Sequence, residues 1–515
     1  MSILRAAATV GSLTMVSRLL GFVRDILMAS ILGAGWVADC FFIAFKLPNF
    51  FRRLFAEGAF NAAFVPLFAE SVEKDGREEA LRFAEEVFAA LLCVLLLFVF
   101  FMQIIMPWAM VVLAPGFMDE PEKYDLAVLL TRLTFPYLLF ISLVSLLAGV
   151  LNAFEKFAAA AMAPILLNIS MIATLLFAHD LLETPAHSLA IAVSMAGGLQ
   201  FAWLYRSCER YGLFIRLRLP QLTPRVKKML RLMLPAALGA GVVQVNLMFD
   251  IILASFLPAG SLSYLFYADR LNQLPLGVIG VAIGTVLLPL LSRQVANGDG
   301  ADVWHSQNRA IELALFLTLP AAIALMVVPG PIIQVLFERG AFSSADSMKT
   351  SWALMAYAAG LPAYVLAKVF TPGYFARQDT KTPVKFAVIA LIANMIFNVI
   401  LMIPFDHVGL AMATALSAWL NVILLVGGLV RRGHYQTDTR LYQRLWRMSG
   451  ATLLMAAAIA AINHYWLAAF WGGDLGQKTA GLVVLVVTGI AVYAITAIGS
   501  GAMTIADLRK FKRRS

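Results

Sequence analysis

Long runs of hydrophobic residues alternate with short polar stretches along this chain. A helix needs roughly 20 apolar residues to cross a bilayer. Runs of about that length predict about fourteen spans, at residues 7–32, 37–56, 83–113, 126–151, 157–179, 187–205, 232–257, 262–291, 310–337, 351–374, 384–404, 408–430, 448–470 and 479–505. The pattern therefore predicts an all-α protein that crosses a membrane many times.

The composition agrees with this fold class. Of the 515 residues, 61% are hydrophobic and only 14% are charged, and the mean hydropathy is +0.83. A soluble core of this length does not require so many apolar residues. The first span also carries internal arginines and lacks a small-residue cleavage site, so it is expected to be retained as a helix.

Lysine and arginine gather in alternate loops. The richer set is Lys74, Arg77, Arg82, Arg206, Arg210, Arg216, Arg218, Arg225, Lys227, Lys228, Arg231, Arg377, Lys381, Lys385, Arg431, Arg432, Arg440, Arg444, Arg447 and the tail 509–514. The positive-inside rule places this set, and with it both termini, in the cytoplasm. Membrane borders and anionic lipid therefore explain the net charge of +10, and nucleic-acid binding is not expected.

A weak internal repeat divides the chain. FFIAFKLPNFF (41–51) resembles YLFYADRLNQL (264–274), and glycines and prolines downstream keep a similar offset. The repeat predicts two six-helix lobes, residues 1–220 and 221–432, followed by two further helices within 433–515. The basic stretch from Arg206 to Arg231 would connect the lobes on the cytoplasmic side. Transporters built from such repeats often bind their substrate between them.

One stretch, residues 17–57, places many charges in apolar sequence. A lone charge at a helix centre costs roughly 2.5–3.5 kcal/mol, so these groups must line a hydrated cavity or pair with one another. They are Arg18, Arg24, Asp25, Asp39, Lys46, Arg52, Arg53 and Glu57, with Asn49 among them.

Ideal helical spacing suggests which of these charges share a face. Asp39, Lys46 and Arg53 recur every seven residues, so they predict one polar stripe, and Arg52 lies about 100° from it. Arg18 shares a face with Asp25. Arg24 lies about 120° from them unless the helix bends at Gly21, which would bring both arginines to one cavity.

The second repeat carries Asp269 and Arg270, and an offset of 224 residues aligns Arg270 with Lys46. One interpretation is that Arg270 faces the same cavity as the arginines of residues 17–57. The alternative is an arginine at a helix end whose side chain reaches the membrane surface.

A second polar set lies in apolar spans of the C-terminal part: Asp250, Asn394, Asn398 and Thr414. A carboxylate with amide and hydroxyl oxygens is a ligand set for a hard cation such as Na⁺. The alternative is hydrogen bonding between helices, which is common for Asn and Thr in membranes. No other cofactor is expected, since the three cysteines are scattered and no zinc-like spacing occurs.

An enzyme is the less favoured class. The chain has no GxxxxGK[ST] loop for ATP, and no nucleophile, base and acid group suggests itself.

Several stretches resemble the lipid II flippases of the MurJ (MviN) family, in the multidrug/oligosaccharidyl-lipid/polysaccharide exporter superfamily. They are SRLLGFVRD (17–25), GAGWVADCFFIAFKLPNFFRRLFAEGAFNAAFVP (33–66), APGF (114–117), YADRL (267–271) and RQDTKTPVK (377–385).

The resemblance implies a flippase that moves lipid-linked peptidoglycan precursor across the bacterial inner membrane by alternating access. It implies that Arg18, Arg24, Arg52 and Arg270 line a central cavity with Asp39, that the last two helices form a groove for the lipid tail, and that Asp250, Asn394, Asn398 and Thr414 match a Na⁺ site. Lipid II and the bilayer are the implied partners, and other cell-wall synthesis proteins are further candidates.

The sequence departs from the family pattern at two positions. Gln273 stands where some relatives have glutamate, and Asn398 stands where a sodium-binding relative has aspartate, which weakens the case for Na⁺ coupling. A flippase for another polyprenyl-linked glycan, a cation-coupled antiporter on the same scaffold and a membrane scaffold without transport activity remain alternatives. The antiporter would need acidic rather than arginine-rich cavity walls.

Overall fold

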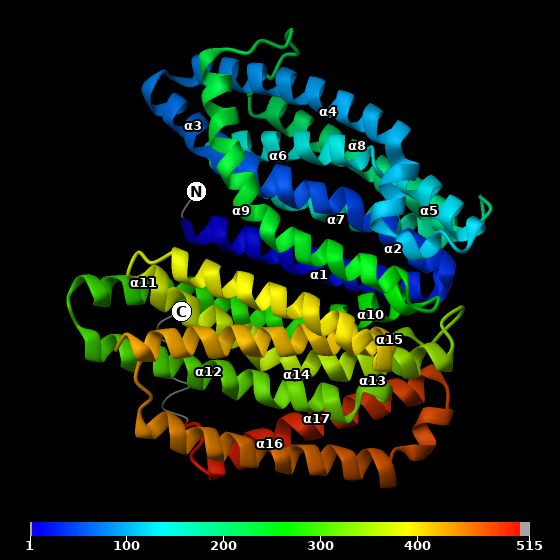
Figure 1. The fold of residues 1–515 in the computed structure, drawn as a ribbon, viewed down its shortest axis with the longest axis vertical. Coiled ribbons are helices and arrows are strands. Elements are labelled where there is room, and N and C mark those ends of the chain that lie inside the picture. The colour runs from blue at the N-terminus through cyan, green and yellow to red at the C-terminus, as the bar shows by residue number, and fades with distance from the viewer. Residues whose placement is uncertain (1–2, 505–515) are drawn as a thin grey trace. The chain divides into compact units, whose positions relative to one another are not determined.

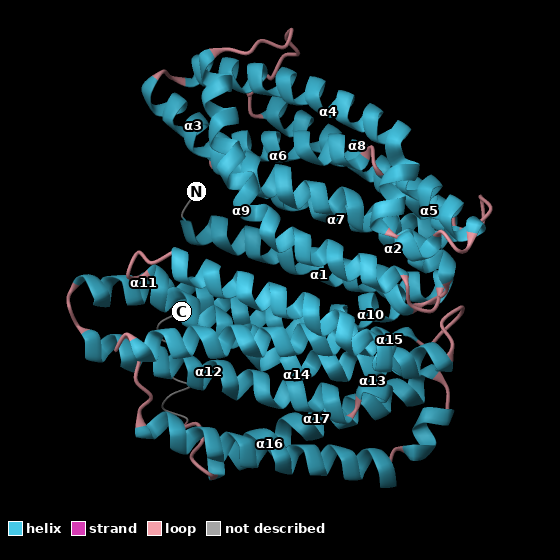
Figure 2. Ribbon diagram, viewed as in Figure 1, coloured by secondary structure: helices cyan, strands magenta, loops and turns pink. Residues whose placement is uncertain are grey.

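The computed structural model describes residues 3–504 of the chain. Within them it describes all side chains except those at positions 3–7, 55–57, 59, 236–240, 242, 243, 278, 281, 282 and 285. Every regular element between residues 3 and 504 is a helix (Figure 2). The predicted all-α fold class is therefore confirmed.

The helices pack into two compact units. The first comprises Met1–Ser263 and Arg339–Phe342, and the second comprises Tyr264–Glu338 and Ser343–Ser515. The boundary between the two packed units therefore falls at Ser263, whereas the sequence repeat places the boundary between the lobes near residue 220. The predicted lobes rest on repeat symmetry and not on packing, so their limits stay a prediction.

The first unit is built from eleven helical elements and the start of a twelfth (Figure 1). The full elements are α1 (Ile3–Leu32), α2 (Trp36–Phe51), the π-helix η1 (Arg52–Phe60), α3 (Asn61–Lys74), α4 (Arg77–Leu113), the 3₁₀ turn η2 (Pro115–Phe117), α5 (Pro121–Thr134), α6 (Tyr137–Ala153), α7 (Phe157–Phe177), α8 (Pro185–Arg210) and α9 (Pro224–Ser255). In its core, the rings of Phe60, Phe64 and Phe68 stack at 5.0 and 5.3 Å because four-residue spacing puts them on one helix face.

The second unit continues the chain from α10, which crosses the boundary. Its elements are α10 (Ser261–Pro275), the π-helix η3 (Leu276–Gly280), α11 (Val281–Ala296), α12 (Gly300–Val327), α13 (Pro329–Phe337), α14 (Ser344–Phe375), α15 (Lys381–Arg431), α16 (Thr439–Tyr465), the 3₁₀ turn η4 (Ala468–Gly472) and α17 (Leu475–Gly499). The last two long helices pack against each other, and α16 also packs on α12 (Figure 1).

Each predicted span falls on helix, but several are not single helices. In the described part of the chain, nine helices are long and apolar enough to cross a membrane. The predicted span 310–337 is wrong as one helix, because α12 ends at Val327 and Pro329 begins α13. Spans 384–404 and 408–430 lie on either side of Asp406, whose φ of 48° and ψ of −131° interrupt α15. The number fourteen therefore stays a prediction.

The repeat is visible in the elements themselves. The order helix, π-helix, helix occurs as α2, η1 and α3 and again as α10, η3 and α11. The first π-helix begins at Arg52 and the second at Leu276, which keeps the offset seen in the sequence. Because π-helices are rare and often mark functional sites, their recurrence supports a common origin for the two segments.

The basic connector is shorter than predicted. α8 extends to Arg210 and α9 begins at Pro224, so Arg225 to Arg231 belong to a helix rather than to a linker. The Thr223 hydroxyl caps α9 by accepting a hydrogen bond from Val226 N at 3.4 Å. Proline is favoured in the first turn that follows such a cap.

Candidate functional site

Arg24 of α1 is buried in the first unit, with 6% of its surface exposed. Its Nε and Nη2 donate to Asp25 Oδ1 at 3.0 and 2.7 Å, and its Nη1 donates to Asn168 Oδ1 at 3.0 Å. Met171 Sδ lies 3.9 Å from Nη1, and Cζ lies 5.9 Å from the centre of the Phe45 ring. An adjacent carboxylate therefore balances the guanidinium charge, which would be costly to bury alone.

The faces predicted for α1 stay a prediction, and the structure adds a side-chain pair that they did not include. Arg24 and Asp25 pair with each other, although neighbours on a helix start out about 100° apart. The long arginine side chain reaches back to its neighbour, and α1 stays one helix through Gly21. Arg18, which was expected to share a face with Asp25, is exposed.

Asn168 of α7 was missed by the sequence reasoning. It is buried, accepts the hydrogen bond from Arg24 and donates from Nδ2 to the Ser17 carbonyl at 2.9 Å. One amide thus ties α7 to α1 and orients the Arg24 side chain. An asparagine within the apolar span 157–179 was the available signal, since a polar group in a membrane helix requires a partner.

The polar residues of α2 lead into η1. Asn49 donates from Nδ2 to the Phe45 carbonyl at 2.8 Å and accepts at Oδ1 from Arg52 Nε at 3.1 Å. Arg52 is half-buried and stands at the first position of the π-helix. Asn49 therefore orients a cation at the point where the helix changes its winding.

The predicted stripe of α2 runs into the π-helix at this point. Lys46 is half-buried in α2, whereas Arg53 is exposed and lies in η1. Seven-residue spacing assumes an α-helix, and α2 ends at Phe51, so the alignment of Arg53 with Asp39 and Lys46 stays a prediction. Glu57 is also in η1, but its side chain lies outside those described.

Asp39 connects α2 to the start of α10 within the first unit. Its side chain is buried, and it accepts hydrogen bonds from Gly260 N at 2.6 Å, Ser263 N at 2.9 Å and Ser263 Oγ at 2.6 Å. The first N–H groups of a helix have no partner within it. The carboxylate of one helix therefore satisfies the beginning of another, a relationship that spacing along α2 alone does not reveal.

Arg270 and Asp269 lie in the second unit, on α10, and both are half-buried. The Arg270 guanidinium carbon lies 4.8 Å from the centre of the Phe266 ring. Gln273 donates from Nε2 to Asp269 Oδ2, so the residue that replaces a glutamate of some relatives pairs with the existing carboxylate. That Arg270 faces the arginines of the first unit stays a prediction.

The predicted cation ligands are divided between the units. Asp250 is on α9 in the first unit, and the other three are on α15 in the second. There, Asn398 Nδ2 donates to Asn394 Oδ1 at 3.1 Å, and the Thr414 hydroxyl donates to the Leu410 carbonyl at 3.0 Å. Within the second unit the set supplies only neutral oxygens, so it fits a hard cation only when Asp250 joins it.

A buried charge network joins α12 and α16 and was not predicted. Glu312 is buried, accepts a hydrogen bond from Arg444 Nη1 at 3.0 Å and pairs with Arg309 and, at 3.6 Å, with Arg440. Arg309 also pairs with Asp438, which precedes α16. Arg440 and Arg444 were predicted to belong to a basic cytoplasmic loop. They instead hold α16 against α12.

Comparison with known proteins identifies the family of this chain. Residues 28–479 match the model of the family described as "Lipid II flippase MurJ". The chain is 44% identical to a probable lipid II flippase MurJ of Rhizobium tropici, covering 100% of this chain and 97% of the relative. It is 39% identical to a probable lipid II flippase MurJ of Vibrio cholerae serotype O1, covering 95% of each.

Solved structures show the same fold. A lipid II flippase MurJ in an inward closed conformation is similar with a TM-score of 0.78 and 27% identity, over 95% of this chain and 98% of that one. A multidrug resistance MATE family transporter has a TM-score of 0.65 over 82% of this chain, and at 15% identity it shows a common fold alone. The resemblance seen in the sequence is therefore confirmed, and the chain belongs to the lipid II flippase MurJ family of membrane transporters.

Proposed function

We propose that this protein is a flippase for lipid II, an undecaprenyl pyrophosphate that carries a disaccharide-pentapeptide. It would move this lipid from the cytoplasmic to the periplasmic leaflet of the bacterial inner membrane. Family membership supports the substrate class, and the observation that carries the mechanism is the oriented, charge-balanced Arg24 inside an apolar unit. Guanidinium groups suit this task, because their planar donors bind phosphate oxygens in pairs.

Asp25 provides the charge balance when no substrate is bound. It pairs with Arg24, and a pyrophosphate that approaches the guanidinium would compete for the same N–H groups. The exposed Arg18 and the half-buried Arg52 supply further positive charge. The anion would thus exchange one partner of Arg24 for another and avoid the full cost of burying a bare charge.

The Asp39 hydrogen bonds offer a mechanism for a periplasmic gate. These hydrogen bonds hold the start of α10 to α2. In an alternating-access cycle they would break when the periplasmic side opens, and Glu57 would help to neutralise the arginines. Arg270 would face the same cavity, and a membrane potential would help to reset a positively charged site by about 2.3 kcal/mol per charge and 100 mV.

Three subordinate proposals complete this picture. The distribution of lysine and arginine supports cytoplasmic termini. A Na⁺ ion would bind Asp250, Asn394, Asn398 and Thr414 together. The wild type should then melt at a higher temperature in Na⁺ than in choline, and an Asp250→Asn variant should lose this difference. Association with other cell-wall synthesis proteins is testable by co-purification.

The deciding experiment measures the transport of tagged lipid II in proteoliposomes of the purified protein. Arg24→Gln and Arg270→Gln are compared with the control Arg82→Gln, which removes an exposed cation paired with Glu79 at 3.6 Å. Loss of a charge-assisted contact of about 1.5–3 kcal/mol predicts transport slowed roughly ten- to a hundredfold in the first two variants. An imposed potential is varied in each case.

Each outcome has a distinct meaning. Wild-type rates in Arg24→Gln and Arg270→Gln would contradict the arginine mechanism. Movement of another polyprenyl-linked glycan without movement of lipid II would keep the mechanism and change the substrate.

A further inference from the structure

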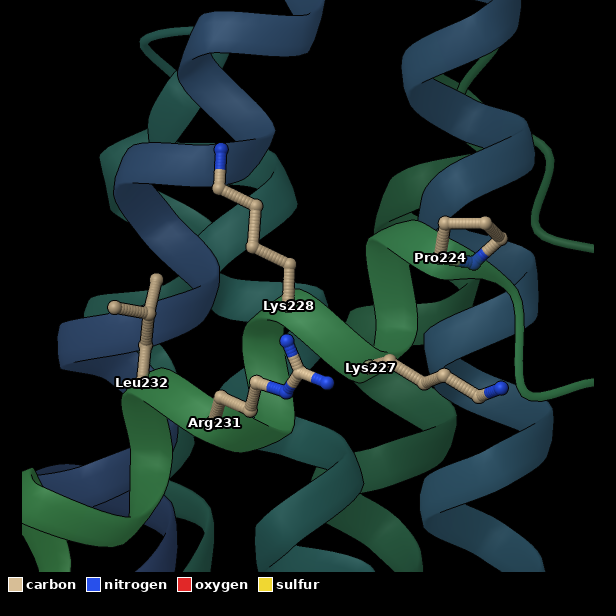
Figure 3. Close-up of a pocket in the computed structure, with 5 residues that line it drawn as sticks. All are labelled: Pro224, Lys227, Lys228, Arg231 and Leu232. Atoms are coloured by element: carbon tan, nitrogen blue, oxygen red, sulfur yellow. The ribbon is translucent and has the colours of Figure 1, made fainter.

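A pocket of about 420 Å³ lies along the first turns of α9, lined by Pro224, Lys227, Lys228, Arg231 and Leu232. Figure 3 shows these five side chains on successive turns: the Arg231 guanidinium lies near the base of the Lys228 side chain, and the Lys227 and Lys228 side chains extend in different directions. All five belong to the first unit. None of them belongs to the Arg24 or Asp39 contacts, so the pocket is a separate feature.

The pocket combines three cations with two apolar side chains. The helix places Val226 and Met229 inward, with 0% and 3% exposed, while the three cations point outward. Lys227 and Arg231 are four residues apart and so share a face. Among the described residues, no acidic side chain lines this pocket and no ion pair involves these three cations.

An adjoining pocket is lined by carboxylates as well as cations. It measures about 190 Å³, shares Lys228 and is lined by Glu70, Lys74, Asp75 and Arg225. There, Lys74 Nζ pairs with Glu70 at 2.8 Å and Arg225 Nη2 pairs with Asp75 at 3.4 Å. Two of the three cations of the adjoining pocket are therefore paired with carboxylates, whereas no carboxylate lines the first pocket.

The start of α9 is held in place, which pre-forms the pocket. The Thr223 hydroxyl donates to Glu86 Oε2 at 2.8 Å, and Glu85, which is buried, accepts from Arg216 N at 3.0 Å and pairs with Arg218. Both glutamates lie on α4. The connector before α9 is thereby fastened to a long helix, so a ligand would meet cations on a fixed backbone.

We propose that this pocket binds the phosphate-bearing head group of a membrane lipid at the cytoplasmic surface. Three cations suit a phosphate or pyrophosphate ester, and its volume suits a head group rather than a lone ion. Leu232 in the pocket and the exposed Leu234 beyond it continue the surface with apolar side chains that suit the attached chains. Basic pockets on the cytoplasmic side of membrane helices are suited to anionic head groups.

This site requires that the start of α9 faces the cytoplasm, as the proposed orientation has it, but it does not depend on which lipid the protein transports. Two sources have this chemistry, an anionic phospholipid such as phosphatidylglycerol and a polyprenyl pyrophosphate. A binding measurement therefore separates this site from the proposed transport, which the flipping assay tests on its own.

The test uses the full-length protein in phosphatidylcholine nanodiscs with a small fraction of photoreactive phosphatidylglycerol, whose diazirine lies near the glycerol end of one acyl chain. After irradiation, mass spectrometry quantifies labelling of the peptide that contains residues 224–232, released by cleavage that does not depend on Lys or Arg. Lys227→Gln/Lys228→Gln/Arg231→Gln is compared with Lys381→Gln/Lys385→Gln/Arg431→Gln. The second variant removes the same charge from exposed positions of the other unit.

Each cation removed is expected to weaken binding about fivefold. Labelling at 224–232 should therefore fall more than tenfold in the pocket variant. The control variant should keep it. Competition by unlabelled phosphatidylglycerol or by undecaprenyl pyrophosphate identifies the source of the head group, and either result supports the site. Arg231→Gln alone, expected to reduce labelling about fivefold, tests the proposal should the triple variant fail to fold. Unchanged labelling in the pocket variants, or an equal loss in the control, overturns the proposal.

Discussion

Arg24 and Asn168 are separated by 144 positions in the chain, yet the Arg24 guanidinium donates a hydrogen bond to the Asn168 amide oxygen at 3.0 Å. The same amide donates to the Ser17 carbonyl, so Asn168 both orients the cation and joins α7 to α1. The orientation of the proposed substrate-binding arginine therefore depends on a helix that carries no charge of its own between Phe157 and Phe177.

Replacement of Asn168 by alanine is expected to slow lipid II transport roughly tenfold. Arg24 would lose an oriented partner whose hydrogen bond to a charged group is worth about 1.5–3 kcal/mol. Flipping rates in proteoliposomes measure the effect, with Asn152→Ala as a control because Asn152 is exposed at the end of α6. Equal rates in the wild type and Asn168→Ala would show that Arg24 needs no support from α7.

The hydrogen bonds between Asp39 and the start of α10 predict non-additive effects on thermal stability. Asp39→Asn should lower the melting temperature more than Ser263→Ala, because the aspartate accepts three hydrogen bonds and the serine hydroxyl supplies one of them. The double variant should melt close to Asp39→Asn, since the hydroxyl then has only a neutral amide oxygen in place of the charged acceptor. Strictly additive shifts in the melting temperature would contradict direct coupling of these two side chains.

Gly340 is expected to tolerate no side chain. Its φ is +58°, and a Cβ there would lie 2.2 Å from the Ser30 carbonyl oxygen, which accepts a hydrogen bond from Ala341 N at 2.7 Å. Gly340→Ala should therefore lower the melting temperature clearly more than Gly298→Ala. Gly298 has a φ of +78° with open space around it, so its substitution measures the backbone strain alone, about 1 kcal/mol. Similar shifts in both variants would rule out the predicted clash.

The buried network of α12 and α16 predicts that Glu312→Gln destabilises the second unit. Removal of one partner from a buried ion pair costs roughly 3–5 kcal/mol, because the remaining charges stay buried. Thermal unfolding of the purified protein should show a lower melting temperature. Glu73→Gln, at an exposed position of α3, should have little effect. A stable Glu312→Gln variant would mean that the arginines of α16 reach water.

The loop between α14 and α15 predicts a dependence on pH. Hydrogen bonds from Thr382 and Arg432 lower the pKa of Asp379 to about 2. A carboxyl group whose pKa is lowered on folding stabilises the folded state above its unfolded pKa of about 3.9, and this stabilisation is lost as pH falls toward 2. Asp379→Asn should therefore melt below the wild type at pH 5 and above, with the difference shrinking as pH falls below 4. A difference that is constant with pH would indicate that the carboxylate charge does not matter.

The charged positions of residues 17–57 were identified from sequence because charge in an apolar span demands an explanation. Their partners were not, because a helical wheel describes one ideal helix at a time. Arg24 donates hydrogen bonds to the adjacent Asp25 and to α7, and Asp39 accepts hydrogen bonds from the start of α10. Arg53 lies in η1, which begins after Phe51, so a helical wheel for α2 alone does not describe it.

By itself, the sequence determined the all-α membrane class, the positions of the apolar spans, the repeat and the family. These follow from hydropathy, periodicity and residue identity, which are properties of neighbours along the chain. Only the tertiary structure decided which polar groups meet, as with Asn168 beside Arg24, Glu312 among the arginines of α16, and Lys227, Lys228 and Arg231 around one pocket. Buried polar groups must find partners, but where helix packing brings those partners depends on contacts between residues far apart in the chain.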